Sequence, residues 1–322
     1  MTETTLAIAL FLQTAVQMGT PILYGTLGGL LGERAGNLNL GVEGMMLMGA
    51  AIGFQAAYVS ANPFIAVMFA GLAGAFGAFL YAVITVSLRG NQIVTGLALT
   101  IFGTGIAGFL GKSLAGLALP AAIKTAFQTI TVPILSDIPI IGKALFAQSP
   151  YVIFAIVAAI IIYLYFTKTT WGQNHKAVGE NPAAADASGI HVTRYKYIAL
   201  LTGGFLCGMG GAYLSLVFVP RWQENITAGL GWIAVALIIF CTWHPLKAVL
   251  GAYFFGALRA VVFKIQGLSL TFFGHSFTLA SNLIDMLPYI MTILVLVFIT
   301  FRNNRKHRPP GWLGVPYFRE DR

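Results

Sequence analysis

Long apolar runs separated by short polar segments dominate this chain. Runs long enough to cross a membrane, with allowance for tilt, lie at 6–31, 40–60, 63–88, 91–111, 150–166, 196–218, 229–242, 246–266 and 281–301. The run at 229–242 is short, and the glycines between residues 32 and 60 leave room for a broken or re-entrant helix. The pattern predicts an all-α, polytopic transmembrane helical bundle of eight to ten spans within residues 1–301.

The composition also indicates a membrane protein. Of the 322 residues, 57% are hydrophobic and only 9% are charged, whereas soluble domains carry about 25% charged residues. The net charge of +9 fits basic residues retained on the cytoplasmic side of a membrane, and no basic stripe interleaved with aromatic residues indicates a nucleic-acid surface. Cys207 and Cys241 lie inside apolar runs, away from any metal-ligand spacing. We therefore expect no metal, no cofactor and no nucleic-acid partner.

The distribution of basic residues predicts an orientation in the cell (inner) membrane. The segment 168–196 is the longest well-charged stretch between apolar runs. If it is cytoplasmic, most basic residues share its side, including those of the tail, 302–322, and the C-terminus is cytoplasmic. The opposite side then holds only Lys112, Lys124, Lys143 and Arg221. Segment 112–149 becomes an extracytoplasmic loop, and the basic tail either anchors on anionic lipid or docks on a cytoplasmic subunit.

A short helix with clear ends is predicted inside the segment 168–196. Asn181 is a favoured N-cap residue, and Pro182 suits the first helical position. Gly189 is the expected C-terminal stop. A helix of about two turns is marginal alone in water. We therefore expect it to pack on the membrane domain behind it and on a partner in front of it.

A second unusual stretch, GERAGNLNLGVEG at 32–44, places polar residues between two apolar runs. Glu33 and Asn37 are four residues apart, as are Asn39 and Glu43, so either pair could share a helix face. Polar groups at membrane depth often mark a transport pathway, and broken helices often line transport sites. Asn37, Asn39 and Glu43 are our pathway candidates. The alternative is an ordinary cytoplasmic turn with a solvated Glu33.

Motifs for bond chemistry are missing from the sequence. Gly111-Lys112-Ser113 resembles the end of a phosphate-binding loop, but Ile106 occupies the position of the required first glycine. No HExxH or GxSxG pattern occurs, and the five histidines are scattered. We therefore expect no catalytic residue and no enzyme activity, and any ATP hydrolysis that drives transport belongs to a separate subunit.

Several segments together resemble a known family. They are residues 32–50, 132–146 and 176–216, together with the turn Trp243-His244-Pro245. The set resembles the ABC importer permeases of the branched-chain amino acid, ribose and nucleoside group. It is most similar to the nucleoside or simple-sugar subfamily that works with basic-membrane-lipoprotein type binding proteins.

This resemblance implies partners and a role for the short helix. An ABC ATPase on the cytoplasmic side would drive transport, a second, related permease would complete a heterodimeric pore in the bilayer, and an extracytoplasmic binding protein would deliver solute. The helix would be the coupling helix that docks on the ATPase. The implied docking residues are Glu180, Asn181, Pro182, Ala184, Ala185, Asp186 and Gly189. Ala183 stands where many importer permeases have glutamate.

The resemblance thus implies a permease subunit of an ATP-driven importer, with nucleosides as the expected solute and simple sugars as the alternative. A second alternative is an ion-coupled secondary transporter or channel. That mechanism calls for ion-coupling acids or for broken helices in two matching halves. The sequence shows one glycine- and asparagine-rich break, at 32–44, without a clear twin.

Overall fold

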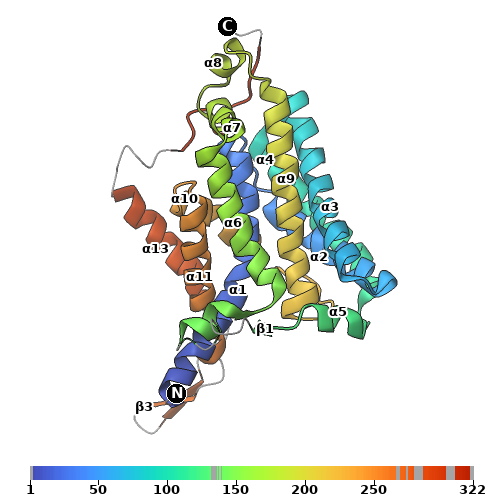
Figure 1. Ribbon diagram of the computed structural model, residues 1–322, viewed down its shortest axis with the longest axis vertical. Helices are drawn as coiled ribbons and strands as arrows, with labels where there is room; N and C mark the ends of the chain where they lie inside the picture. Colours follow the sequence, from blue (N-terminus) through green and yellow to red (C-terminus); the bar gives the residue numbers. More distant parts are fainter. Residues whose placement is uncertain are drawn as a thin grey trace.

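The fold is an elongated helical bundle, seen in a computed structural model (Figure 1). The structure describes residues 3–131, 136, 138, 140–265, 269–272, 275–278, 286–301 and 309–319. Parts of the predicted outer loop, residues 281–285 of the last apolar run, and residues 302–308 of the tail lie outside the described residues.

Seven helices among the described residues are long and apolar enough to cross a membrane. They are α1 (Glu3–Arg34), α2 (Val42–Ser60), α3 (Pro63–Ala82), α4 (Gln92–Leu114), α6 (Pro150–Lys168), α9 (Val192–Tyr213) and α11 (Pro245–Ile265). The π-helical segments η1 (Val83–Ser87) and η3 (Leu214–Phe218) extend α3 and α9. The predicted all-α transmembrane bundle is confirmed.

The remaining elements are short. The apolar helix α10 (Leu230–Phe240) lies in the short predicted run 229–242, and α13 (Leu287–Phe301) lies in the described part of the run 281–301. The loops contain α5 (Ala121–Ala126), η2 (Gly142–Phe146), α7 (Thr170–Glu180) and α8 (Pro182–Ala187). Strand β1 (Ile130–Thr131) pairs antiparallel with β2 (Ala147–Gln148), and β3 (Ser269–Phe272) pairs antiparallel with β4 (His275–Thr278).

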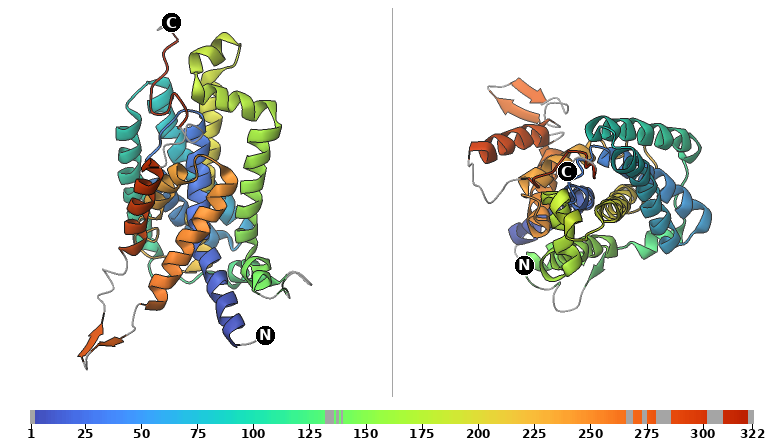
Figure 2. Two further views of the ribbon diagram at one scale, coloured as in Figure 1. Left: turned by 90° about the vertical axis from the view of Figure 1, so that its left-hand side faces the viewer. Right: turned by 90° about the horizontal axis from the view of Figure 1, so that it is seen from above.

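Helices α1 and α9 form the centre of the bundle. Helix α1 packs on α9, α10 and α11, while α9 packs on α2 and α3 (Figure 2). A Cβ atom on Gly28 of α1 would lie 2.4 Å from the carbonyl oxygen of Gly203 in α9, so only glycine permits this backbone approach. Membrane helix bundles commonly have small residues at helix contacts, because association in lipid depends on close van der Waals packing rather than on the hydrophobic effect.

The two loop regions lie at opposite ends of the bundle. Helices α7 and α8 and the described C-terminal residues form one end, while α5, β1 and the start of α1 form the other (Figure 1). The predicted loops 168–196 and 112–149 are thus separated by the length of the spanning helices. The assignment of the α8 end to the cytoplasm remains a prediction from the basic residues.

Candidate functional site

Helix α8 forms where the sequence predicts it. The side-chain oxygen of Asn181 accepts the Ala184 N–H at 3.0 Å, which satisfies one of the open donors of the first turn. Gly189 follows the helix with φ of +81°, and the next N–H, of Ile190, bonds the Ala185 carbonyl at 3.0 Å. The cap, the proline and the glycine therefore set both ends of this helix.

One side of α8 is buried and the other is open. Pro182 and Ala185 are buried, and Ala185 belongs to a small apolar cluster with Val178 of α7 and Val192 of α9. Ala184, like Ala187 and Gly189, is exposed. The open side therefore presents small side chains, which allow another protein surface to approach closely.

Two acidic residues, Glu180 at the end of α7 and Asp186 within α8, are held by a C-terminal segment. Residues 309–319, here called the C-terminal strap, run along α7 and α8. The Gly311 N–H donates to Glu180 Oε2 at 3.0 Å. The Tyr317 hydroxyl donates to Asp186 Oδ2 at 3.1 Å, and Arg319 Nε lies 3.1 Å from the same oxygen. The tail residues that the structure describes thus rest on the predicted docking segment.

The three pathway candidates lie in or beside a break between α1 and α2. Asn37 and Asn39 belong to the non-helical linker, residues 35–41, and Glu43 lies in the first turn of α2. All three are buried. Because the linker is not helical, the spacing of four residues does not place Glu33 with Asn37, or Asn39 with Glu43, on a shared helix face. Asn39 instead accepts the Gly41 N–H at 2.8 Å.

Glu43 meets the start of α10. Its carboxylate accepts the Thr227 hydroxyl, the Gly229 N–H at 2.9 Å and the Gly231 N–H at 2.6 Å. An acidic group at a helix N-terminus is favoured because the open N–H groups there carry partial positive charge. The buried carboxylate therefore ties the break after α1 to the beginning of α10.

The other end of α10 returns to α1. Trp243 Nε1 donates to Glu33 Oε2 at 2.6 Å, and Arg34 Nε and Nη2 donate to the Trp243 carbonyl at 3.0 and 2.9 Å. Only 1% of Glu33 is exposed. A solvated turn therefore does not describe this stretch, since Glu33 and Arg34 bind the predicted Trp243-His244-Pro245 turn.

His175 anchors α7 to the end of α1. Its Nε2–H donates to the Leu31 carbonyl at 2.9 Å, and its Nδ1 accepts the Tyr165 hydroxyl at 3.2 Å. Burial and the nearby Arg34 charge lower the pKa of His175 while the hydrogen bond to Leu31 raises it, and the net pKa falls from 6.5 to about 4. The imidazole is therefore neutral at pH 7 and fixes α7, and with it α8, to the bundle.

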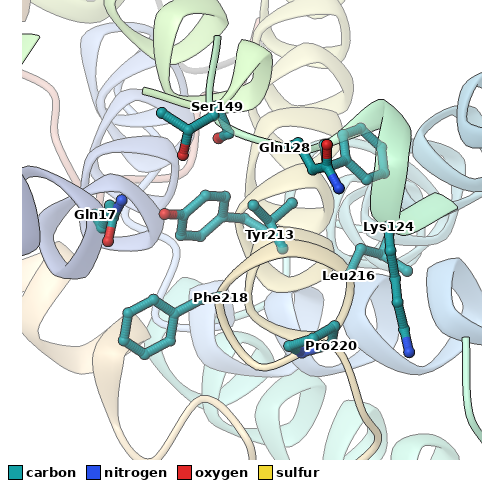
Figure 3. A pocket seen from close by; sticks show the side chains of 11 residues that line it. Gln17, Lys124, Gln128, Ser149, Tyr213, Leu216, Phe218 and Pro220 are labelled. Carbon is teal, nitrogen blue, oxygen red and sulfur yellow. The ribbon is translucent and has the colours of Figure 1, made fainter. Parts of the chain in front are cut away.

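A cavity of about 410 Å³ opens at the end opposite α8. Its lining includes Gln17 of α1, Lys124 of α5, Ser149 before α6, and Tyr213 of α9. In Figure 3 the Tyr213 ring extends toward Gln17, and Ser149 lies above the ring. The Ser149 hydroxyl is buried without a hydrogen-bond partner among the described residues. The lining of the cavity therefore combines aromatic rings with the amide side chains of Gln17 and Gln128.

The comparison with protein families decides what kind of chain this is. Residues 11–296 match the family model described as the branched-chain amino acid transport system / permease component. The chain belongs to this permease family. It is a multi-pass membrane subunit of an ABC importer and a transport subunit without a catalytic role. An ABC permease works with an ATPase and a binding protein, so the ion-coupled alternative is set aside.

Relatives of this permease are assigned to two solute classes. TsgC13 of Haloferax volcanii, provisionally assigned as a glucose ABC transporter permease protein, is 35% identical over 91% of this chain and 92% of its own length. The guanosine ABC transporter permease protein NupQ of Bacillus subtilis is 31% identical over 98% of both chains. The nucleoside ABC transporter permease protein NupC of Lactococcus lactis subsp. cremoris is 34% identical over 86% of this chain and 88% of its own.

Two of these organisms also have a second, more distant relative of the permease. TsgB13 of Haloferax volcanii, a glucose ABC transporter permease protein, is 29% identical over 74% of this chain and 65% of its own length. NupB of Lactococcus lactis, a nucleoside ABC transporter permease protein, is 30% identical over 33% of this chain and 30% of its own. Related pairs of permeases therefore occur in organisms that have a relative of this chain.

The cavity and the contacts of α10 were missed by sequence reasoning. Their residues come from segments far apart in the chain, such as Glu43 and Thr227, and no local pattern joins them. The one available signal was the polar stretch 32–44, which drew attention to Glu43 without indicating a partner. Among the described residues, no group of three or more His, Cys, Asp or Glu side chains could hold a metal.

Proposed function

We propose that this permease imports nucleosides, that α8 is its coupling helix, and that the α8 end faces the cytoplasm. The observation that carries the proposal is the geometry of α8: a capped helix at one end of the bundle, buried on one side and open on the other. ATP binding closes the nucleotide-binding domains of the ATPase, which displaces α8 as a rigid unit. The spans then exchange outward-open and inward-open states.

The docking residues fall into three groups. Asn181, Pro182 and Gly189 shape α8, as its cap, its first residue and its stop. Ala185 seats the helix in the apolar cluster, and Ala184 lies on the open side. Glu180, which precedes the helix, and Asp186, within it, both contact the strap. The ATPase therefore meets mainly the small side chains of α8.

Nucleosides suit the cavity at the opposite end. The ring centroids of Tyr213 and Phe218 lie 6.4 Å apart in a stacked pair, and the partly exposed Phe218 ring provides an aromatic surface for a base. The amides of Gln17 and Gln128 suit the hydroxyls of a ribose. The nucleoside assignments of NupQ and NupC support the same solute, while TsgC13 supports the sugar alternative.

The pathway is proposed to run past the break between α1 and α2. Asn37, Asn39 and Glu43 are polar groups within an apolar bundle, and α2 and α10 both begin beside them. Groups of this kind in a membrane bundle usually mark a pathway or its gate. A second, related permease would complete the pore as a heterodimer, as suggested by the paired relatives TsgC13 with TsgB13 and NupC with NupB.

Reconstitution tests the function. Proteoliposomes containing this permease, its second permease and the ATPase, supplied with binding protein and ATP, should accumulate labelled guanosine or adenosine. Glucose uptake with no nucleoside uptake would refute the solute assignment alone. Uptake by this permease without any ATPase, driven by an ion gradient, would refute the whole proposal.

Two substitutions in the α8 region test the docking role. Gly189→Pro cannot adopt the observed φ of +81°, and Ala184→Asp adds a charge to the open side. Both should leave membrane insertion intact while separating ATP hydrolysis from uptake. Gly105→Ala, at a spanning position where an added Cβ meets open space, is the matched control. Normal uptake by both variants would remove the reason to call α8 a docking helix.

A further inference from the structure

The C-terminal strap contacts the linker between α1 and α2 as well as α8. The Gly314 N–H donates to the Gly36 carbonyl at 3.1 Å, and the Trp312 N–H donates to the Gly179 carbonyl at 3.0 Å. Gly36 has φ of +84°, so the chain turns at this residue from α1 into the linker. The strap therefore joins the end of α7 to the point where the first span is interrupted.

The backbones of α7 and α1 also touch beneath the strap. A Cβ atom on Gly179 would lie 2.1 Å from the Arg34 carbonyl oxygen and 3.1 Å from the Gly36 nitrogen. Farther along the strap, the Arg89 guanidinium lies 4.9 Å from the centre of the Phe318 ring. The strap, the end of α7 and the linker thus form one closely packed unit.

Helix α8 depends on this unit for its position. It has six residues, too few for a stable helix without packing. Tyr317 of the strap packs against the cluster that buries Ala185, and its hydroxyl holds Asp186. Without the strap, the helix would keep α7 and the first turn of α9 as supports but would lose these contacts.

We propose that the C-terminal strap is a positioning element that fixes α8 to the linker, so that a displacement of α8 is delivered at Gly36 and at the break beyond it. The inference rests on the proposed function, because it assumes that the ATPase displaces α8. A rigid connection is needed because α8 lies outside the spans while the linker lies among them. Helix α7 supplies one contact at Gly179, and the strap supplies a second route to Gly36.

Truncation after residue 308 and the substitution Gly314→Pro test the connection. The truncation removes every strap contact, whereas the proline removes the N–H that binds the Gly36 carbonyl. Val315→Ala is the matched control, because Val315 is an exposed strap residue. We expect both test variants to copurify with the ATPase in normal amounts and to lose about tenfold or more of their ATP-dependent uptake. ATP hydrolysis should continue but no longer respond to loaded binding protein.

Two outcomes would overturn the proposal. Normal uptake by the truncated permease would mean that α8 needs no strap. Loss of ATPase from the truncated complex, with uptake falling in proportion, would make the strap a docking contact rather than a connection. If the wild-type permease neither binds an ATPase nor shows ATP-dependent uptake, the proposed function itself fails, which separates the two failures.

Cross-linking provides a second test that does not depend on removing a segment. In the double variant Asp186→Cys with Tyr317→Cys, the contact between strap and helix is lost, and a short reagent with two thiol-reactive groups can restore it covalently. The natural cysteines, Cys207 and Cys241, are buried and will not compete. We expect cross-linking to raise the uptake of this variant. Lower uptake after cross-linking would overturn the proposal, since it would mean that the strap must release α8 during transport. Unchanged uptake would also overturn it, since the restored contact would then have no effect on transport.

Discussion

Replacing Glu43 by glutamine probes the buried contact between the starts of α2 and α10. In the wild type, Glu43 Oε1 accepts from Thr227 and from the Gly229 N–H, and Oε2 accepts the Gly231 N–H. Glutamine has one accepting oxygen and one NH₂ group. Whichever way the amide turns, its NH₂ group faces at least one backbone or hydroxyl donor, and the negative charge at the N-terminus of α10 is lost.

The structure sets the size of the effect. A hydrogen bond to a charged group contributes about 1.5–3 kcal/mol, and an acid at a helix N-terminus adds about 0.3–1 kcal/mol, more when partly buried. If one charged hydrogen bond and the helix interaction are lost, the free energy of unfolding should fall by about 2–4 kcal/mol. Glu224→Gln, at an exposed position in the segment before α10, should leave the free energy of unfolding unchanged.

The free energy of unfolding can be measured by SDS titration of the purified permease in mixed micelles. Thr227→Val removes one donor and allows a double-mutant cycle with Glu43→Gln, in which the coupling energy should reach about 1 kcal/mol. A Glu43→Gln variant within about 0.5 kcal/mol of the wild type would refute the reasoning, as would additive effects of the two substitutions.

Three further predictions concern other buried contacts. Because the pKa of His175 is lowered to about 4, neutral His175 stabilises the fold above pH 6.5, and this stabilisation is lost as the pH falls toward 4. Between pH 7 and pH 5 the free energy of unfolding of the wild type should therefore fall by about 2 kcal/mol, a loss that a His175→Gln variant should not show when both are unfolded at the two pH values. Trp243→Phe removes the donor to Glu33 and should cost about 2 kcal/mol, much of it recovered by adding Glu33→Leu; no recovery would contradict a role for the buried carboxyl group that loses its partner. Gly103→Ala places a Cβ 2.4 Å from a carbonyl of α2 and should cost about 1–3 kcal/mol, whereas Gly105→Ala should cost little, and equal stability of the two variants would contradict the packing argument.

The helices were predictable because their signals are local. The lengths of the apolar runs predicted the ends of the spanning helices to within a few residues, as for α4 (Gln92–Leu114), which was expected at 91–111. The ends of α8 followed from Asn181, Pro182 and Gly189, whose preferences depend on the backbone immediately around them. Short-range sequence patterns were therefore enough to predict both the fold class and the candidate docking helix.

The contacts that join the parts of the site were not predictable, because they connect distant segments. Glu43 and Thr227 are 184 residues apart, and Asp186 and Tyr317 are 131 apart. The basic and aromatic residues of the tail favoured a lipid anchor over docking on a cytoplasmic subunit, and they indicated no contact with α7 or α8. The spacing of Asn39 and Glu43 suggested a helix face, but Asn39 lies in the non-helical linker, so a helical period did not apply.

The position of the strap has a consequence for the order of biosynthesis. Residues 309–319 follow α13 in the chain, yet they pack on α7, α8 and the linker after α1. The surface around α8 is therefore finished only when the last described segment has left the ribosome and folded back. A permease whose synthesis stops after α11 would have its central spans in the membrane but an incomplete α8 region. The connection between α8 and the linker would in this way be reserved for chains translated through the strap, even where the ATPase already binds.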